Sequence, residues 1–589
     1  MKLVKENMDN LKNENVGKEV SALTLLKLLP TSRLTKTEDF LRILNGRTTK
    51  EIKSQLMDLL GAVQTKESHE AFRKGLNFTN EEDFNFIERY LQSLAVGVRP
   101  KVSTIEDLLE VANEKLENEN LLDTLIQTIA SMALRFTKLP NENYESPIVT
   151  KVSEYLLKSL DACDKDECKA MFLRGMQNLR SPATVTKLLE FAFDKSYHLS
   201  VAAMKALKEI PVEFCTKEMK KQFETIFFQR SKRFDSSART IALDILLNMK
   251  PKPEDVQMFI EFLKSNDKAY EVKQYLVQKL KMIAEKCPRF RETMQRALAA
   301  DVEVNNWNVY GGLKGLSTVL ERRFSQIPSF NGSLLSVQEM NGGALKRGSV
   351  DLLMRSDDEQ FSLFTLGLFA GGLSSFMGGA DEEVDENEDT TATAGMDLAI
   401  QGAQMRRLTF FKGQGELMGH VWSGTASEST PAYQGSTILQ DHKQIVMLNN
   451  GAIIDFSAIG SISVDLNGKI DISLWNRNAN SEVMQMCGTA LIGSLELRSS
   501  FVKLTNELQI TEEPQIHLSS KIDFSSQTTL CLQLSQPNTK LSQKILRTIR
   551  IPGVKKDVFK YHLNLIYKLP GFTHSLNRKN NEMCNKIFK

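Results

Sequence analysis

Residues 452–474 read AIIDFSAIGSISVDLNGKIDISL, and this stretch decides the fold class of the second half of the chain. Its even-numbered positions are apolar or small: Ile454, Phe456, Ala458, Ile462, Val464, Leu466, Ile470, Ile472 and Leu474. A period of two is typical of a β-strand with one apolar face. Residues 467–469 (NGK) predict a three-residue turn that pairs Val464 with Ile472 in a hairpin.

The same alternation continues toward the C-terminus. It recurs at Val502, Leu504, Leu508 and Ile510, at Ile516, Leu518, Ile522 and Phe524, and at Leu530, Leu532 and Leu534. Such segments predict long antiparallel strands, each with one apolar face. Residues 304–589 are therefore expected to form antiparallel β-sheets.

The chain before this region has a helical period. Ile52, Leu56, Leu59, Leu60 and Val63 form one apolar stripe. The segments VAAMKALKEIP (201–211) and IALDILLNMKP (241–251) align at an offset of 40 residues, a period typical of HEAT-like α-solenoids. We expect an α+β multidomain chain with a polar segment at 1–20 and an α-solenoid at 21–303, followed by the sheets.

Composition and motifs argue against several function classes. The 75 basic and 73 acidic residues nearly cancel, which argues against nucleic-acid binding through bulk charge. No P-loop, GxGxxG, HExxH or GxSxG motif occurs, and Asp441 and His442, as neighbours along a strand, point to opposite faces. No paired Cys/His spacing suggests a metal site. We therefore predict no enzyme activity, no catalytic residue, no metal and no cofactor.

Residues 361–380 (FSLFTLGLFAGGLSSFMGGA) are uncharged and long enough to cross a bilayer. Five glycines and three serines within them favour a lipid-facing strand and a short helix inside a larger fold over a membrane span. The following residues 378–395 are rich in Gly, Asp, Glu and Thr and predict a flexible acidic loop. A calcium site there is the less favoured interpretation, because the spacing of a calcium loop is missing.

Apolar sheets and a helical solenoid enclose either a dry core or a lipid-filled cavity. Removing apolar surface from water contributes about 25 cal/mol of favourable free energy per Å², whether side chains or acyl chains cover that surface. The period of the apolar residues therefore does not distinguish the two options. The apolar stretch 361–380 favours lipid. The main alternative is a HEAT-like protein-binding scaffold in trafficking without lipid transfer. A lipid-storing yolk component is a third interpretation, but the serine-rich regions typical of such proteins are absent.

Signals for the cellular compartment point in different directions. The first twenty residues are charged and lack the apolar core of a signal peptide, which taken alone indicates the cytosol. Composition alone favours reduced thiols for the seven cysteines. Cys163 and Cys168, however, flank a polar stretch in which a tight loop would bring them within bonding range.

The C-terminal half resembles the microsomal triglyceride transfer proteins, which belong with vitellogenin and apolipoprotein B to the large lipid transfer protein family. The resemblance lies in LTFFKGQGELM (408–418), SLWNR (473–477) with Val483 after it, SSFVK (499–503) and NNEMC (580–584). In the helical half it lies in ARTIALDILLNM (238–249) and the pair Cys163/Cys168. It implies a carrier of phospholipid, triglyceride and cholesteryl ester that moves its cargo between membranes without covalent chemistry and loads nascent lipoproteins.

The resemblance also implies partners and disulfides. A heterodimer with protein disulfide isomerase, contacted within about 214–300, would work in the endoplasmic reticulum lumen, with an apolipoprotein B-like or lipophorin-like acceptor and transient membrane contact. The pairs Cys163/Cys168 and Cys531/Cys584 stand at disulfide positions. Arg239 and Gly413 fall at structural positions, and Arg239 is either an exposed helix start or a charge that needs a partner.

Residues 368–379 and 478–486 correspond to two short helices at a membrane and at the cavity mouth. The expected lipid or membrane contacts are Leu368, Phe369, Leu373, Phe376, Met377, Trp475, Val483, Met484 and Met486. Met484, Gln485 and Met486 are uncharged where vertebrate members are basic, which leaves the preferred lipid open. The family also begins with a signal peptide and an N-terminal β-barrel that this sequence lacks, so we expect a fragment.

Overall fold

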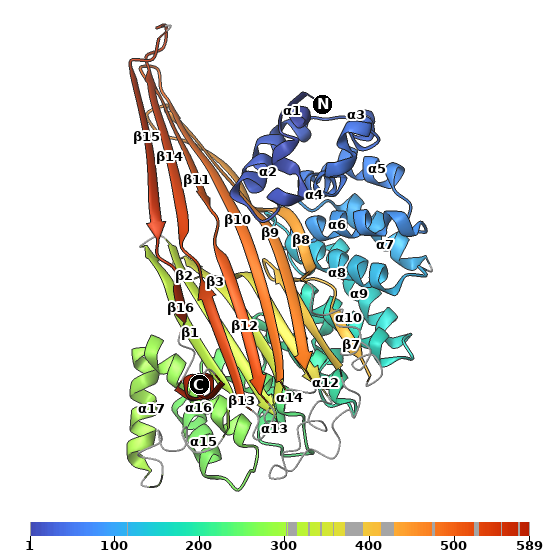
Figure 1. The fold of residues 1–589 in the computed structure, drawn as a ribbon, viewed down its shortest axis with the longest axis vertical. Coiled ribbons are helices and arrows are strands. Elements are labelled where there is room, and N and C mark those ends of the chain that lie inside the picture. Colours follow the sequence, from blue (N-terminus) through green and yellow to red (C-terminus); the bar gives the residue numbers. More distant parts are fainter. Residues whose placement is uncertain are drawn as a thin grey trace.

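The computed structural model describes residues 2–114, 116–301, 303, 315–327, 330–341, 344–356, 359–371, 393–413, 429–473, 478–523, 529–554, 556–574 and 578–587. A curved stack of helices lies along one side of two antiparallel sheets (Figure 1). Among the described residues, no helix combines the length and apolarity that crossing a bilayer requires.

The helical half runs from Lys2 to Ala300. Its α-helices are α1 Lys2–Glu6, α2 Glu19–Ser32, α3 Thr37–Leu44, α4 Lys53–Val63, α5 Lys66–Gly75, α6 Phe84–Ala95, α7 Val102–Asn113, α8 Glu119–Phe136, α9 Pro147–Asp161, α10 Asp166–Leu179, α11 Val185–Ala192, α12 Tyr197–Glu209, α13 Lys217–Phe227, α14 Ser236–Asn248, α15 Pro253–Lys264, α16 Tyr270–Lys286 and α17 Pro288–Ala300. Short 3₁₀ turns, such as η3 Arg47–Ile52 and η6 Val212–Phe214, connect several of them.

The helices form two layers. Even-numbered helices from α4 to α16 pack on one another in order, and their inner side contacts the sheets, while odd-numbered helices cover the outside. The stripe from Ile52 to Val63 is buried, as its period predicts. The 40-residue repeat corresponds to α12 and α14, which are neighbours in the inner layer. The solenoid prediction is confirmed. The first twenty residues contribute Val4, Leu11 and Val16 to buried positions.

Sheet A consists of β1 Thr318–Ile327, β2 Phe330–Asn341, β3 Ala344–Ser356, β4 Glu359–Gly371, β5 Thr393–Ile400, β6 Ala403–Gln404 and β7 Leu408–Lys412. The order is β1-β2-β3-β4-β5-β6, and β7 also pairs with β5. Phe364 and Leu366 of β4 are buried, so the strand expected within 361–380 is present.

Sheet B consists of β8 Thr430–Met447, β9 Ile453–Ser473, β10 Asn478–Arg498, β11 Lys503–Glu512, β12 Gln515–Asp523, β13 Thr529–Gln536, β14 Thr539–Arg550, β15 Phe559–Leu569 and β16 Phe572–His574. On one side β10 pairs with β9 along its full length. On the other side it pairs first with β12, over residues 478–486, and then with β11, over residues 489–498. Sheet B therefore has a lower part with β12, β13 and β16 and an upper part with β11, β14 and β15.

The predicted hairpin turn at 467–469 is wrong. These residues lie inside β9, where Gly468 pairs with Val483 of β10 and with Thr430 of β8. A strand with long partners on both sides has its backbone groups satisfied without a turn, so Asn-Gly is accommodated in the extended chain. Val464 and Ile472 are consequently two positions of one strand.

The two predicted short helices are also corrected. Residues 478–486 form the first part of β10 and pair with β9 on one side and β12 on the other. A short isolated helix forms fewer backbone hydrogen bonds than a strand with a partner on each side, so the strand is favoured here. Residues 368–371 end β4 and pair with β3 and β5; residues 372–379 lie outside the described part. Of the predicted acidic loop, residues 393–395 begin β5, and the remainder lies outside the described part.

Both predicted disulfides are present. Cys163–Cys168 joins the connection after α9 to the first turn of α10, and Cys531–Cys584 joins β13 to the C-terminal helix α21 Arg578–Ile587. Asn580 of α21 accepts a hydrogen bond from the Leu532 N–H at 2.9 Å and donates one to the Leu532 carbonyl at 2.8 Å. Cys215, Cys287 and Cys487 carry free thiols, so reduced thiols are wrong for the four bonded residues.

Candidate functional site

One face of sheet B carries an extended set of apolar side chains, and we call it the inner face. In antiparallel pairs, directly opposed residues share a face. Leu497 of β10 opposes Ile454 and Leu504, and Leu504 opposes Ile549, which opposes Phe559. The same registers place these residues on the inner face: Ile454, Phe456, Ile462, Val464, Leu466, Leu491, Leu495, Leu497, Leu504, Leu508, Ile510, Ile516, Leu518, Leu532, Leu534, Leu541, Ile545, Ile549, Phe559, Tyr561, Leu563, Leu565, Tyr567 and Leu569.

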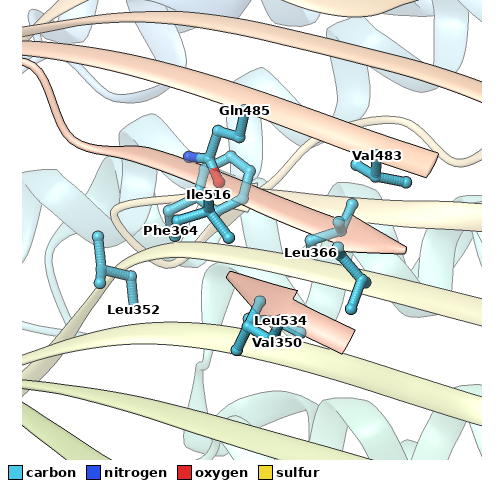
Figure 2. Close-up of a pocket in the computed structure, with 9 residues that line it drawn as sticks. Val350, Leu352, Phe364, Leu366, Val483, Gln485, Ile516 and Leu534 are labelled. Carbon is cyan, nitrogen blue, oxygen red and sulfur yellow. The ribbon is translucent and has the colours of Figure 1, made fainter. Parts of the chain in front are cut away.

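The lower inner face lies against sheet A. A narrow cavity between them is lined by Val350, Leu352, Phe364 and Leu366 of sheet A and by Val483, Gln485, Ile516, Leu518 and Leu534 of sheet B (Figure 2). Its volume is about 10 Å³, roughly the space that one water molecule needs. The two apolar faces are thus closed on each other, and a lipid chain can enter only if the sheets move apart.

The upper inner face extends beyond sheet A. In Figure 1 the upper ends of β10, β11, β14 and β15 continue past the strands of sheet A. Phe456, Leu495, Phe559 and Tyr561 are accordingly exposed, and Tyr561 retains 44% of its accessible surface. Large contiguous apolar surface on a protein marks a binding surface for a protein, a membrane or a lipid. This surface continues directly into the closed cavity below.

The opposite, outer face of sheet B is occupied by helix α2 and the segment before it. The Ser461 hydroxyl donates to the Ala22 carbonyl at 2.7 Å, and the Gly17 N–H donates to the Ser463 hydroxyl at 2.9 Å. A Cβ added at Gly488 would lie 2.0 Å from the carbonyl carbon of Lys18, so only glycine permits this approach. Small residues of the outer face such as Gly488 seat the N-terminal segment and α2, and Ile459 and Ile492 on the same face pack against the helical core.

A partly buried cluster of ion pairs joins the solenoid to sheet A. Asp397 of β5 lies 2.7 Å from Lys205 of α12 and 2.8 Å from Arg407. Burial acts to raise the pKa of Asp397, but the charges of Arg407 and Lys205 outweigh it and hold this pKa below its ordinary value.

A second cluster surrounds Asp244 of α14. Its carboxylate lies 3.0 Å from Lys208 and 2.8 Å from Lys279, and it accepts a hydrogen bond from the Tyr275 hydroxyl at 2.9 Å. Burial again acts to raise the pKa of Asp244, but the charges of Lys208 and Lys279 lower it. Both clusters pair cations with carboxylates and lie away from the inner face, so we interpret them as structural.

The predicted contact residues separate between faces. Leu368 packs against the apolar cluster between the sheets, and Val483 lines the cavity. Phe369 lies on the other face of sheet A, with the Arg407 guanidinium 4.3 Å from its ring centre. Met484 and Met486 point to the outer face of sheet B, where Met484 is exposed. Leu373, Phe376, Met377 and Trp475 lie outside the described residues.

The two predicted structural residues differ in their surroundings. Arg239 is 1% exposed; it donates to the Phe227 carbonyl at 2.9 Å and pairs with Asp267 at 2.6 Å. Of the two interpretations, the charge with a partner is therefore correct. Gly413 follows β7 with φ +95°, a backbone conformation that favours glycine. In the described part of the chain, no group of three or more His, Cys, Asp or Glu side chains could hold a metal ion.

The sequence reasoning missed the upper inner face contributed by β14 and β15. The signal is present in the alternation of Phe559, Tyr561, Leu563, Leu565, Tyr567 and Leu569. The polar residues between them, such as Lys560 and Asn564, face outward. This is the same period of two that identifies β9.

Comparison with known proteins agrees with this architecture. A family model described as the MTP large subunit lipid-binding domain matches residues 317–589, and one described as the vitellogenin TPR domain matches residues 1–281. The microsomal triacylglycerol transfer protein of Drosophila melanogaster is 42% identical to this chain over the chain's whole length, and the match covers 67% of the Drosophila protein. The large subunit of the microsomal triglyceride transfer protein of Sus scrofa is 23% identical over 98% of this chain, and the match covers 64% of the Sus scrofa protein.

A solved structure has a similar fold. The structure titled for lipid–protein interactions in lipovitellin superposes with a TM-score of 0.64 over 95% of this chain and 61% of its own, at 13% sequence identity. At that identity the likeness concerns the fold alone. It confirms helices followed by antiparallel sheets as one architecture.

Proposed function

Because the chain belongs to the microsomal triglyceride transfer protein family, we propose that it is a lipid carrier that moves phospholipid and neutral lipid between membranes and loads them onto nascent lipoproteins. The observation that carries this proposal is the mainly apolar inner face, which is exposed in its upper part and closed against sheet A in its lower part. Asn506, Gln543 and Arg547 are polar residues on it. Acyl chains are the ligand chemistry that such a surface binds.

Transfer needs no covalent step. Lipid chains cover the upper inner face and enter below as the two sheets separate, and each Å² of apolar surface removed from water contributes about 25 cal/mol. The ion pair between Asp397 of β5 and Lys205 of α12 holds sheet A on the solenoid while the inner cavity changes its width, and the ion pairs of Asp244 hold neighbouring helices of the solenoid together. Bound lipid is cargo in this scheme, and no catalytic residue or further cofactor takes part.

The partners and location that the family resemblance implies extend this proposal. Protein disulfide isomerase would be contacted within about 214–300, and an apolipoprotein B-like or lipophorin-like particle would accept the cargo. Two disulfides support an oxidising compartment such as the endoplasmic reticulum lumen.

A scaffold without lipid transfer is the alternative, and the inner face argues against it. A HEAT-like scaffold binds proteins along its solenoid, but here the inner layer of helices already contacts the sheets. A scaffold also gives no reason for apolar side chains across β9, β10, β11, β14 and β15.

Adjacent residues of β15 provide the test. Leu565 points to the inner face and Ile566, which is 67% exposed, to the outer face of the same edge strand. In a fluorescent-lipid transfer assay between vesicles, with protein disulfide isomerase co-expressed, Leu565→Asp should lower the transfer rate at least about fivefold, because a charge in an acyl-chain site is costly. Ile566→Asp should leave it within about twofold. Equal rates in the two variants, or no transfer by the unmodified chain, would contradict the proposal.

A further inference from the structure

Three hairpin ends of sheet B lie side by side at the open end of the inner face. Arg498 pairs with both Ile453 and Lys503, Lys503 pairs with Arg550, and Ile453 pairs with Met447. The connections 448–452, 499–502 and 551–558 are therefore neighbours at one edge of the molecule. We call this edge the hairpin edge; it includes the upper tip of the β14–β15 hairpin in Figure 1.

Each hairpin end exposes apolar side chains to solvent. Met447 borders the first connection, Phe501 lies in the second, and Val554 and Val558 lie in the third. Phe501 is 82% exposed and Val554 50% exposed. Isolated exposed apolar residues are ordinary, but three chain-distant connections that each present them at one edge form a common surface.

Basic residues surround these apolar tips. The described residues 550, 556 and 560 at the third connection are Arg550, Lys556 and Lys560, with Asp557 as the nearby acidic residue. At the second connection Arg498 and Lys503 both pair with Glu496, so five cations border the edge against two carboxylates. Asp557 pairs with Arg550, while Lys556 and Lys560 are exposed. Apolar tips with a cationic border fit the interface of a bilayer that contains anionic headgroups, since the tips enter the acyl boundary and the cations meet the headgroups.

We propose that the hairpin edge docks on an anionic lipid bilayer. The inference rests on the proposed lipid-transfer function, since a carrier has to meet the membrane that supplies its cargo. Docking there brings the upper inner face, through Phe559 and Tyr561 next to the third hairpin end, to the bilayer surface. Lipid then has a continuous apolar path from the membrane along β14 and β15 toward the cavity between the sheets.

The test is co-sedimentation of the full chain with phosphatidylcholine vesicles that do or do not contain phosphatidylserine. We expect stronger binding to the anionic vesicles and a decrease with added salt. The double variant Phe501→Asp/Val554→Asp should bind at least about tenfold more weakly, because it removes two apolar contacts and adds two negative charges.

The matched control is Leu34→Asp/Val212→Asp. These residues are of similar size and exposure, 87% and 47%, but lie outside the three connections of the hairpin edge, Leu34 after α2 and Val212 in η6. The control should bind like the unmodified chain, and thermal melts should show that both variants are folded.

Equal binding by the two double variants would overturn the inference, as would binding that does not depend on phosphatidylserine. A dimer of the unmodified chain that Phe501→Asp dissociates would overturn it too, because it would assign the edge to a second copy. Lipid transfer in the same preparations separates the two proposals. If the edge variant still binds vesicles and still transfers lipid like the unmodified chain, only the docking edge is rejected. If the unmodified chain binds vesicles but transfers no lipid, only the carrier function is rejected.

Discussion

Asp397 contacts Lys205 of α12 at 2.7 Å and Arg407 at 2.8 Å, so one carboxylate links the solenoid to sheet A. The sequence offers no signal for this contact, because the partners are 192 and 10 residues away and neither spacing belongs to a helix or strand pattern. The same holds for Asp244, which forms ion pairs with Lys208 and Lys279 of neighbouring helices. Periodicity predicts which residues are buried, whereas specific ion pairs depend on tertiary placement.

At this residue scale we predict that Asp397→Asn destabilises the chain by on the order of 3 kcal/mol at pH 7, because two largely but not fully buried cations lose their carboxylate. The folded-state pKa of Asp397 lies below its ordinary value of 3.8. Its contribution is therefore fully present above the unfolded-state pKa and is lost as the pH falls below about 4 toward the folded-state pKa.

Urea unfolding of both proteins between neutral and acidic pH checks this prediction. The difference between them should shrink below about pH 4. The control is Asp161→Asn, whose carboxylate is largely exposed and pairs with Lys187 at 2.8 Å; it should cost less than about 1 kcal/mol. A pH-independent difference for Asp397→Asn would show that charge does not explain its effect.

At the scale of single elements, β10 decides the shape of the site. Because β12 pairs with its first part and β11 with its second, sheet B divides into a covered lower part and an open upper part. The alternation in the sequence predicts β9 and much of β11 to β13. It does not reveal that Gly468 continues β9 or that 478–486 is a strand, because both depend on partners that supply hydrogen bonds on either side.

The C-terminal helix α21 gives a second prediction at this scale. Its disulfide closes a separation of 53 residues, whereas Cys163–Cys168 closes 5. From the entropy of loop closure in the unfolded chain, the longer loop's disulfide stabilises the fold by about 4 kcal/mol and the shorter loop's by about 2 kcal/mol. Cys584→Ser should therefore destabilise more than Cys168→Ser, and amide exchange should increase in β13, where Asn580 bonds to Leu532. Unchanged exchange in β13 would mean that α21 holds its place without the disulfide.

At the scale of the whole molecule, the sequence predicts helices, then sheets, and a choice between dry core and lipid cavity. In the structure the lower inner face is closed on sheet A, and the upper inner face is exposed. This division could not be predicted from periodicity, because an apolar strand face looks the same in sequence whether protein or lipid covers it. The predicted contacts were correspondingly mixed, with Leu368 and Val483 at the cavity cluster and Phe369, Met484 and Met486 on other faces.

The central claim is that acyl chains occupy the inner face of sheet B. The most direct measurement loads the full chain with a phospholipid that carries a photoactivatable group on one acyl chain, irradiates it and maps the adducts by mass spectrometry. We predict adducts on inner-face residues such as Leu491, Leu508, Ile545 and Leu563. Adducts confined to the outer face of sheet B or to the solenoid would contradict the account.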